Sequence, residues 1–293
     1  MKNLSSPVAL ILFLAFVPLS HAEKIDESAL KGWGFLAHTL TERGMPEKTV
    51  RKIFLDRRMP KFSLVPFSIT PKESKRLYSD FLSPTRVRKT KAYMKRHQRY
   101  FQGAEASERI PKEVIASIIQ IETNLGTYTG NYRILPQLAR LANAGSSKNV
   151  KKNYERLLKD KDQEEEVTFE KVEKRGEYLV NLFTPEVEAT VRIASKKGFS
   201  PFAMRGSRAG AFGYAQFLPT SFERFAKDGN KDGIISLYQH PDAIYSVGSF
   251  LSHYVGDREV TESNLRSAIW EYNRSEPYVE TVLKLSSVLG LKL

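Results

Sequence analysis

The chain has 293 residues, a formal net charge of +13 and no cysteine, and its pI is near 9.7. Without cysteine there is no disulfide, no thiolate metal site or nucleophile, and no cysteine to carry a lipid anchor. The length suits one large domain or two small ones with ample core, and the basic balance indicates an anionic partner.

Residues 1–22 have the pattern of a signal peptide. Lys2 gives a positive start, an apolar run covers residues 8–17, and Ser20-His21-Ala22 forms a small-x-small cleavage site. The run is short for a membrane span, so the mature chain is expected to be exported, soluble and without a transmembrane segment. Export argues against nucleic acid as the anionic partner. An acidic cell-wall polymer or an anionic membrane surface fits better.

Residues 23–105 predict a helical region with an irregular link. Apolar residues at helical spacing indicate one helix over residues 30–40, and Pro46 can open a second one. Three prolines between residues 60 and 71 keep the next stretch extended or irregular. A basic helix follows over 86–101, and its charges are interpreted as a solvated face, with wall binding as the alternative.

The most informative predicted helix lies between Pro111 and Gly126. Its apolar stripe is formed by Val114, Ile115, Ile118 and Ile119. Continuing that stripe by one turn reaches Glu122, a carboxylate that would lose water with no obvious Lys or Arg beside it. Desolvation should raise the pKa of Glu122, which is what a general acid needs near neutral pH. The alternative is that the stripe ends first and that Glu122 points to solvent.

Residues 148–182 carry many charges of both signs, including Glu164-Glu165-Glu166. They predict one or two exposed helices, which would form an insertion beside the core. No internal repeat or low-complexity tract accompanies them.

Glycine and alanine recur through residues 206–219, so the backbone there is expected to approach something closely. The polar and aromatic groups of this stretch are those that a sugar groove uses: Ser207, Tyr214 and Gln216, with Phe212 and Phe217. Tight packing, which also favours small residues, is the alternative. Thr220 to Glu223 then predicts a capping box at the start of the next helix.

Residues 228–236 have the pattern that opens a calcium loop. Oxygen ligands alternate, a glycine allows the sharp turn and a backbone carbonyl follows: Asp228, Asn230, Asp232, Gly233 and Ile234. Gln239 stands where a bidentate Glu normally closes such a loop, and the nearest replacement carboxylate is Asp242. An ordinary Asx-rich loop without a metal is the alternative.

Together these stretches resemble the lytic murein transglycosylase B family. The resemblance is carried by Ile121-Glu122-Thr123 with Gly126, by the 206–219 stretch, by the loop that follows, and by Trp270-Glu271-Tyr272-Asn273 with Tyr278. It is specific over residues 110–138, 203–250 and 268–283, weaker before residue 100 and poor across 143–182. The absence of cysteine makes the chain similar to soluble, non-lipidated members.

The resemblance implies a mainly α fold with a lysozyme-like core and cleavage of peptidoglycan between N-acetylmuramic acid and N-acetylglucosamine. By position, Glu122 corresponds to the single catalytic carboxylate. The implied substrate-binding residues are Ser207, Gln216, Phe217, Tyr272, Asn273, Tyr278 and, by a weaker alignment, Tyr78. The implied ligands of a structural calcium ion are Asp228, Asn230, Asp232, the Ile234 carbonyl and Asp242. No organic cofactor is expected.

The implied organisation has five segments. They are a signal peptide (1–22), an N-terminal helical region (23–105), the first part of the core (106–142), a charged helical insertion (143–200) and the second part of the core (201–293) with its calcium loop at 228–242. Two departures from the family pattern stand out. Residues 251–270 are too few for the small β domain that other members carry there, and Phe250 replaces an expected aromatic hydroxyl.

A single carboxylic acid implies an unusual mechanism, because ordinary glycosidases use two carboxylates. Neutral Glu122 would protonate the bridging oxygen, and its ionised form would then take the proton of the C6 hydroxyl, which closes a 1,6-anhydro ring. Two alternatives remain: a lysozyme-like muramidase that uses water, and a peptidoglycan-binding protein without turnover. The expected setting is the periplasm, with glycan strands as partner, no nucleic acid and a monomeric state.

Overall fold

The computed structural model describes residues 29–70, 74–160 and 166–292. The predicted signal peptide lies outside these residues. Within them, no helix is both long and apolar enough to cross a membrane.

The described chain is mainly helical, as predicted. The elements, in chain order, are α1 (Gly34–Glu42), α2 (Glu47–Phe54), the 3-10 helix η1 (Lys75–Leu82), α3 (Pro84–Arg96), α4 (Gln98–Glu108), α5 (Lys112–Thr123), β1 (Tyr132–Arg133), α6 (Ile134–Ala142), α7 (Ser147–Leu157), α8 (Phe169–Lys196), β2 (Arg205–Gly206), α9 (Pro219–Phe225), α10 (His240–Val255), α11 (Glu262–Tyr272) and α12 (Glu276–Leu289). The named strands of this part of the chain are one short antiparallel pair, in which Tyr132 lies opposite Gly206. The expected lack of a small β domain agrees with this arrangement.

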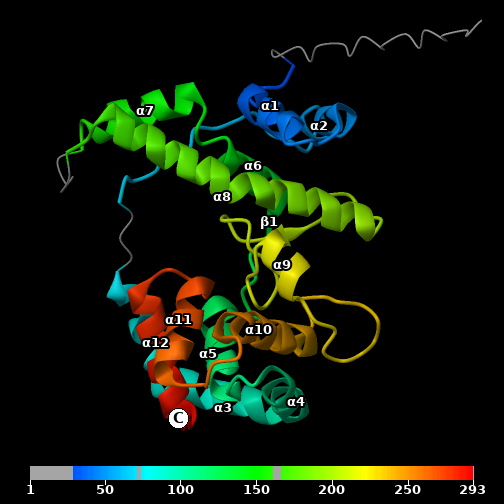
Figure 1. Ribbon diagram of the computed structural model, residues 1–293, viewed down its shortest axis with the longest axis vertical. Helices are drawn as coiled ribbons and strands as arrows, with labels where there is room; N and C mark the ends of the chain where they lie inside the picture. Colours follow the sequence, from blue (N-terminus) through cyan, green and yellow to red (C-terminus); the bar gives the residue numbers. More distant parts are fainter. Residues whose placement is uncertain (1–28, 71–73, 161–165, 293) are drawn as a thin grey trace, which may run out of the picture.

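Helix α5 forms the centre of the lower part of the molecule (Figure 1), where it packs against α4, α10 and α12. Every residue from Val114 through Gln120 is inaccessible to solvent. The sequence predicted one apolar stripe, but α5 is buried on all sides, which is typical of a central core helix. Its two ends approach the surface, at Lys112 in the first turn and at Ile121 and Glu122 in the last.

The upper part of the molecule is built around α8, which packs against α6, α7 and α9 (Figure 1). The proline-rich link, predicted to be extended or irregular, crosses this part without helix or strand. Asn149 of α7 accepts a hydrogen bond from the Val65 N–H at 2.7 Å, and Asn153 accepts one from the Phe67 N–H at 3.0 Å. Both asparagines are buried, so α7 supplies the partners that the backbone of the link lacks.

Two local predictions were wrong. The single basic helix predicted over 86–101 is divided at His97, where α3 ends and α4 begins. The predicted capping box is absent, because α9 begins at Pro219 and has no side-chain cap of its own. Instead, buried Glu186 of α8 accepts bonds from the Thr220 N–H at 2.8 Å and the Thr220 hydroxyl at 2.5 Å.

Candidate functional site

Helix α5 ends in a tight turn that begins two residues after Glu122. Asn124, Leu125 and Gly126 have φ angles of 50°, 60° and 87°, so three successive residues adopt the left-handed region. The Thr123 hydroxyl accepts a bond from the Gly126 N–H and donates to the Tyr214 carbonyl, both at 3.0 Å. Thr123 therefore ties the last turn of α5 to the glycine-rich stretch, a role that the sequence analysis missed.

Glu122 is partly buried, and one of its carboxylate oxygens accepts a 2.7 Å hydrogen bond from the Tyr278 hydroxyl. Tyr278 lies on α12 and is 1% exposed. Burial raises its pKa well above the ordinary value for tyrosine, and the nearby Glu122 charge raises it further. The phenol therefore keeps its proton and remains a donor at neutral pH.

Tyr78 also lies at this site. It is on η1, and its ring contacts the Tyr278 ring edge-on, with centroids 6.0 Å apart. The structure thus places Tyr78 against the partner of Glu122, although its alignment from sequence was the weakest of the set.

Tyr272 joins the end of α11 to the glycine-rich stretch. Its hydroxyl donates to the Ala215 carbonyl at 2.5 Å, and its ring lies 5.8 Å from Phe217 and 4.7 Å from Phe250. Phe250, which replaces an expected hydroxyl, is a buried member of this aromatic cluster. Asn273 follows as the residue that ends α11, with its N–H bonded to the Ile269 carbonyl at 3.1 Å.

The small residues of the glycine-rich stretch make room for the protein's own chain. A Cβ on Gly210 would lie 2.2 Å from the Leu138 side chain, and one on Gly213 would lie 2.3 Å from the Leu237 side chain. Both glycines also have positive φ angles, so substitution there would be strained as well as crowded. This observation favours the tight-packing alternative for those glycines.

Gln216 and Ser207 have mainly local partners. Gln216 has a φ of 48°, and its amide donates to the Gly213 carbonyl at 2.8 Å and to the Thr129 carbonyl at 3.3 Å. The Ser207 hydroxyl accepts a bond from the Ala211 N–H at 3.1 Å, within its own turn. The structure therefore brings Glu122, Tyr278 and Tyr78 into one connected group. Tyr272 adjoins this group, because the nearby Glu122 charge adds to burial in raising the Tyr272 pKa, and it links the group to Phe217 of the glycine-rich stretch.

The loop at 228–242 has oxygen-rich local geometry. Asp228 accepts bonds from the Asp232 and Gly233 N–H groups, and Asp232 accepts one from the Ile234 N–H at 2.8 Å. Buried Asp242 accepts bonds from the Gly229 and Ser236 N–H groups at 2.9 and 2.7 Å, and burial raises its pKa.

The side chains of this loop fit a hard cation in chemistry, because carboxylate, amide and carbonyl oxygens are the ligands of calcium. In the described part of the chain, however, no three acidic or histidine side chains are grouped as a metal site. The Asn230 amide nitrogen faces Asp232 and Gln239, at 2.9 and 2.8 Å. The Asn230 oxygen accepts a bond from the Asp232 N–H at 3.1 Å, and it is this oxygen that would have to be shared with a bound cation.

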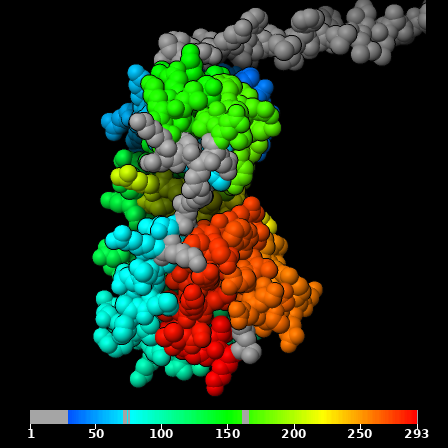
Figure 2. Space-filling model, turned by 90° about the vertical axis from the view of Figure 1, so that its left-hand side faces the viewer, coloured from blue at the N-terminus to red at the C-terminus, as the bar shows by residue number. Residues whose placement is uncertain are grey.

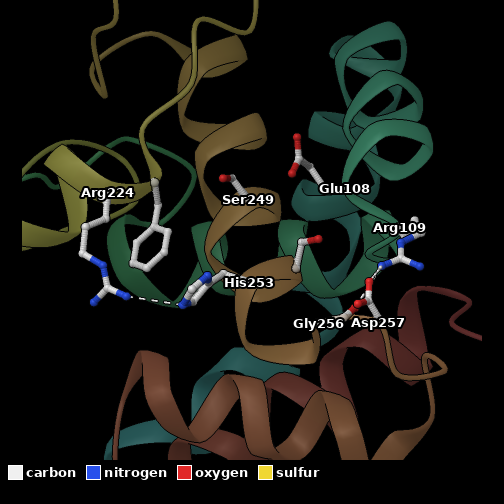
Figure 3. Close-up of a pocket in the computed structure, with 9 residues that line it drawn as sticks. Glu108, Arg109, Arg224, Ser249, His253, Gly256 and Asp257 are labelled. Atoms are coloured by element: carbon white, nitrogen blue, oxygen red, sulfur yellow. Dashed lines mark hydrogen bonds and ion pairs between the residues drawn. The ribbon is translucent and has the colours of Figure 1, made fainter.

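A hollow of about 540 Å³ lies between α4, α9 and α10, and Figure 3 shows the residues that line it. Arg109 donates to the Gly256 carbonyl at 2.9 Å, and Arg224 lies 3.3 Å from His253. None of the site residues predicted from the sequence lines this hollow. Its cations already interact with groups of the protein, so its size alone does not make it the candidate site.

The comparisons with known proteins agree with the fold. The family model described as "Transglycosylase SLT domain" matches residues 31–260. The chain is 30% identical, over 232 residues, to membrane-bound lytic murein transglycosylase B of Escherichia coli K12, which covers 78% of this chain and 56% of that protein. The chain thus spans about half the length of this curated relative.

Solved structures share the architecture at lower identity. The soluble lytic transglycosylase SltB1 of Pseudomonas aeruginosa matches with a TM-score of 0.63 and 21% identity, over 88% of this chain and 98% of that one. The Escherichia coli lytic transglycosylase Slt35 in complex with calcium matches with a TM-score of 0.61 and 19% identity, over 88% and 92% of the two chains. These likenesses show the lysozyme-like fold. Tyr272, Asn273 and Tyr278 lie beyond the residues that the family model matches.

Proposed function

Because the chain belongs to the transglycosylase SLT domain family, we propose that it is a lytic murein transglycosylase. It cleaves the β-1,4 bond between N-acetylmuramic acid and N-acetylglucosamine and leaves 1,6-anhydro ends. The observation that carries this proposal is the carboxyl group of Glu122, held by buried Tyr278 at the partly exposed end of a buried helix.

Glu122 acts twice in the proposed reaction. Its neutral form gives a proton to the bridging oxygen as that bond breaks, and its ionised form then accepts the proton of the C6 hydroxyl. The C6 oxygen bonds to the ring carbon that lost the bridging oxygen. The first proton leaves on the departing sugar's new hydroxyl, and the proton of the C6 hydroxyl restores neutral Glu122 for the next cut. Water is not consumed. The internal attack is favoured because the hydroxyl is already held at the reacting centre.

Tyr278 positions the carboxyl group. Its hydroxyl remains protonated and fixes one oxygen of Glu122, and its ring is itself packed against Tyr78. A catalytic group needs such support, because small errors in position cost large factors in rate. Tyr78, Tyr272, Asn273, Ser207, Gln216 and Phe217 are proposed to contact the sugar or to shape the groove.

The loop at 228–242 is proposed to bind a structural calcium ion. Asp228, Asn230, Asp232, the Ile234 carbonyl and Asp242 would hold it. A cation there would neutralise the loop carboxylates and fix the connection between α9 and α10, and it takes no part in the chemistry at Glu122.

The proposed setting is the periplasm, reached through the signal peptide over residues 1–22, and the protein is proposed to act there as a monomer. The anionic partner indicated by the net charge is then the peptidoglycan itself.

Digestion of purified peptidoglycan in water labelled with heavy oxygen tests the reaction. A transglycosylase gives unlabelled anhydro ends, because the new bond is made by the sugar's own hydroxyl. A muramidase gives reducing ends that contain the label. Mass spectrometry should find mainly unlabelled anhydro ends, and mainly labelled reducing ends would exclude the proposed reaction while sparing the role of Glu122 as acid.

A further inference from the structure

Arg86 of α3 bonds to two different parts of the chain. Its guanidinium donates to the Asp80 carboxylate at 2.7 Å and to the Asn124 side-chain oxygen at 2.9 Å. It also lies over the Phe81 ring, 4.9 Å from the ring centroid. Asp80 and Phe81 belong to η1, whereas Asn124 ends α5. Arg86 therefore ties the corner between η1 and α3 to the end of the central helix.

The end of α5 that Arg86 holds is the end that carries Glu122. Asn124 follows Glu122 by two residues and has a φ of 50°, in the left-handed region that closes the helix. Its side-chain oxygen also accepts a bond from the amide of buried Gln120 at 3.3 Å. An arginine side chain has donors only, so the Asn124 oxygen must face Arg86, and the Gln120 amide must turn its nitrogen toward that oxygen. Arg86 thus determines how both amides are oriented.

The corner that Arg86 holds carries Tyr78, a proposed sugar contact. The Tyr78 ring lies on η1, 6.2 Å from the Phe81 ring and 6.0 Å from the Tyr278 ring. Figure 2 shows η1 and α3, in cyan, beside α12, in red, and η1 packs against both helices. Because the Tyr278 hydroxyl donates to Glu122 at 2.7 Å, a path of direct contacts leads from the carboxyl group to η1.

These contacts close into a ring around the end of α5. One side runs from the Glu122 carboxyl through the two tyrosines to η1, and the other runs from η1 through Arg86 and Asn124 back to Glu122. The contact between the tyrosine rings is the less directional side. The Arg86 side consists of charge-assisted hydrogen bonds from a planar, rigid group, which fix both distance and direction.

We propose that Arg86 is a positioning residue for the lytic reaction, because it sets where Tyr78 lies relative to the Glu122 carboxyl. The inference rests on the proposed function, in which Tyr78 contacts the sugar at Glu122. Arg86 itself touches neither the sugar nor the carboxyl in this proposal. Without its bonds the η1 corner would shift against α5, and a misplacement of about 1 Å costs about 100-fold in rate.

The kinetic test compares Arg86→Met with Arg88→Met, which removes the same charge from an exposed position of the same helix. The Arg88 guanidinium bonds to the Thr85 hydroxyl at 3.4 Å, within α3, so this bond joins neither η1 nor α5. On soluble peptidoglycan strands, Arg86→Met should lower kcat about tenfold to 100-fold and change KM by a smaller factor, because position and not binding is lost. Arg88→Met should keep both constants. Circular dichroism at the assay temperature checks that both variants are fully folded, so that a lower kcat is not a smaller folded fraction.

A second measurement does not depend on turnover. In protein with carbon-13 in its tyrosine rings, the NMR signals of Tyr78, assigned with Tyr78→Phe, report the ring of Tyr278 beside it. Arg86→Met should shift or broaden these signals, and Arg88→Met should leave them in place. If the wild type has no lytic activity but the signals respond to Arg86→Met alone, the proposed function fails and the placement of Tyr78 by Arg86 stands. Unchanged Tyr78 signals in Arg86→Met, or an equal fall in kcat for both variants, would overturn the proposal.

Discussion

Glu122 accepts the Tyr278 hydrogen bond through an oxygen that an amide can also offer, which makes one substitution especially informative. Glu122→Gln keeps the volume and the bond to Tyr278 but cannot supply a proton. Turnover of purified peptidoglycan should fall on the order of 100-fold to 10,000-fold, the usual worth of general acid–base catalysis. Glu113→Gln, at the other end of α5, is the matched control and should keep most of the activity. Wild-type turnover by the Glu122 variant would show that Glu122 is not the general acid of the reaction.

Tyr278 links the site to stability at high pH. An unfolded tyrosine has a pKa near 10, and burial raises the folded value well above that. Between these two values only the unfolded chain releases the proton, so the free energy of unfolding falls as pH rises, by about 1.4 kcal/mol per pH unit for this group. Below the unfolded pKa the group adds no pH dependence.

Tyr278→Phe should therefore show a shallower loss of stability from about pH 10 upward. Urea unfolding from about pH 9 to pH 11 measures the slope for wild type, for Tyr278→Phe and for Tyr128→Phe, whose ring is 72% exposed. The Tyr128 variant should follow wild type. Parallel curves for wild type and Tyr278→Phe would contradict the buried, protonated phenol.

At the level of elements, α8 and α9 are joined by a cap that comes from a distant part of the chain. Glu186 satisfies the Thr220 N–H and hydroxyl at the start of α9. Glu186→Ala should lower the free energy of unfolding by about 1–3 kcal/mol, the cost of leaving buried groups without partners. Glu223→Ala removes only the partly exposed pair with Arg192 and should cost less than about 1 kcal/mol. An equal loss in the free energy of unfolding for the two variants, measured by chemical unfolding, would show that the Glu186 contacts to Thr220 contribute no more than the partly exposed ion pair.

The helices themselves were largely predictable, because apolar spacing and prolines determine them locally. The start of α9 was not, because the acceptors come from Glu186, more than thirty residues earlier in the chain, and a capping-box pattern cannot reveal them. Likewise, the stripe on α5 identified Glu122, yet it could not reveal that the helix is buried on all sides. The burial of α5 depends on α12, α10 and α4, which pack against it from other parts of the chain.

For the whole molecule, calcium is expected to act through stability. A ligand that binds only the folded state at ~100 times its dissociation constant adds about 2.7 kcal/mol. Thermal unfolding with calcium and with chelator should differ by several degrees, and Asp232→Ala should abolish the difference. Asp257→Ala, an exposed carboxylate outside the loop, should keep it. Identical melting of the wild type in both conditions would favour a loop without metal.

The site, like the helices, was predictable where the local sequence determines it. Residue types and order were enough to select Glu122, Tyr272 and Tyr278 through the family resemblance. The bonds of Tyr278 to Glu122, of Tyr272 to the Ala215 carbonyl and of Thr123 to the Tyr214 carbonyl were not predictable. Each joins segments far apart in the chain, and only the packed fold specifies which atoms meet.

The bond between Tyr278 and Glu122 spans 156 positions of the chain, and this separation has a consequence for folding order. Contacts of high sequence separation form late, because the entropy of closing a long loop must be overcome first. Synthesis starts at the N-terminus and completes α5 long before α12. The carboxyl group therefore lacks its partner until almost the whole chain has been made and folded, so the proposed activity, which depends on this bond, would be silent in an incomplete chain.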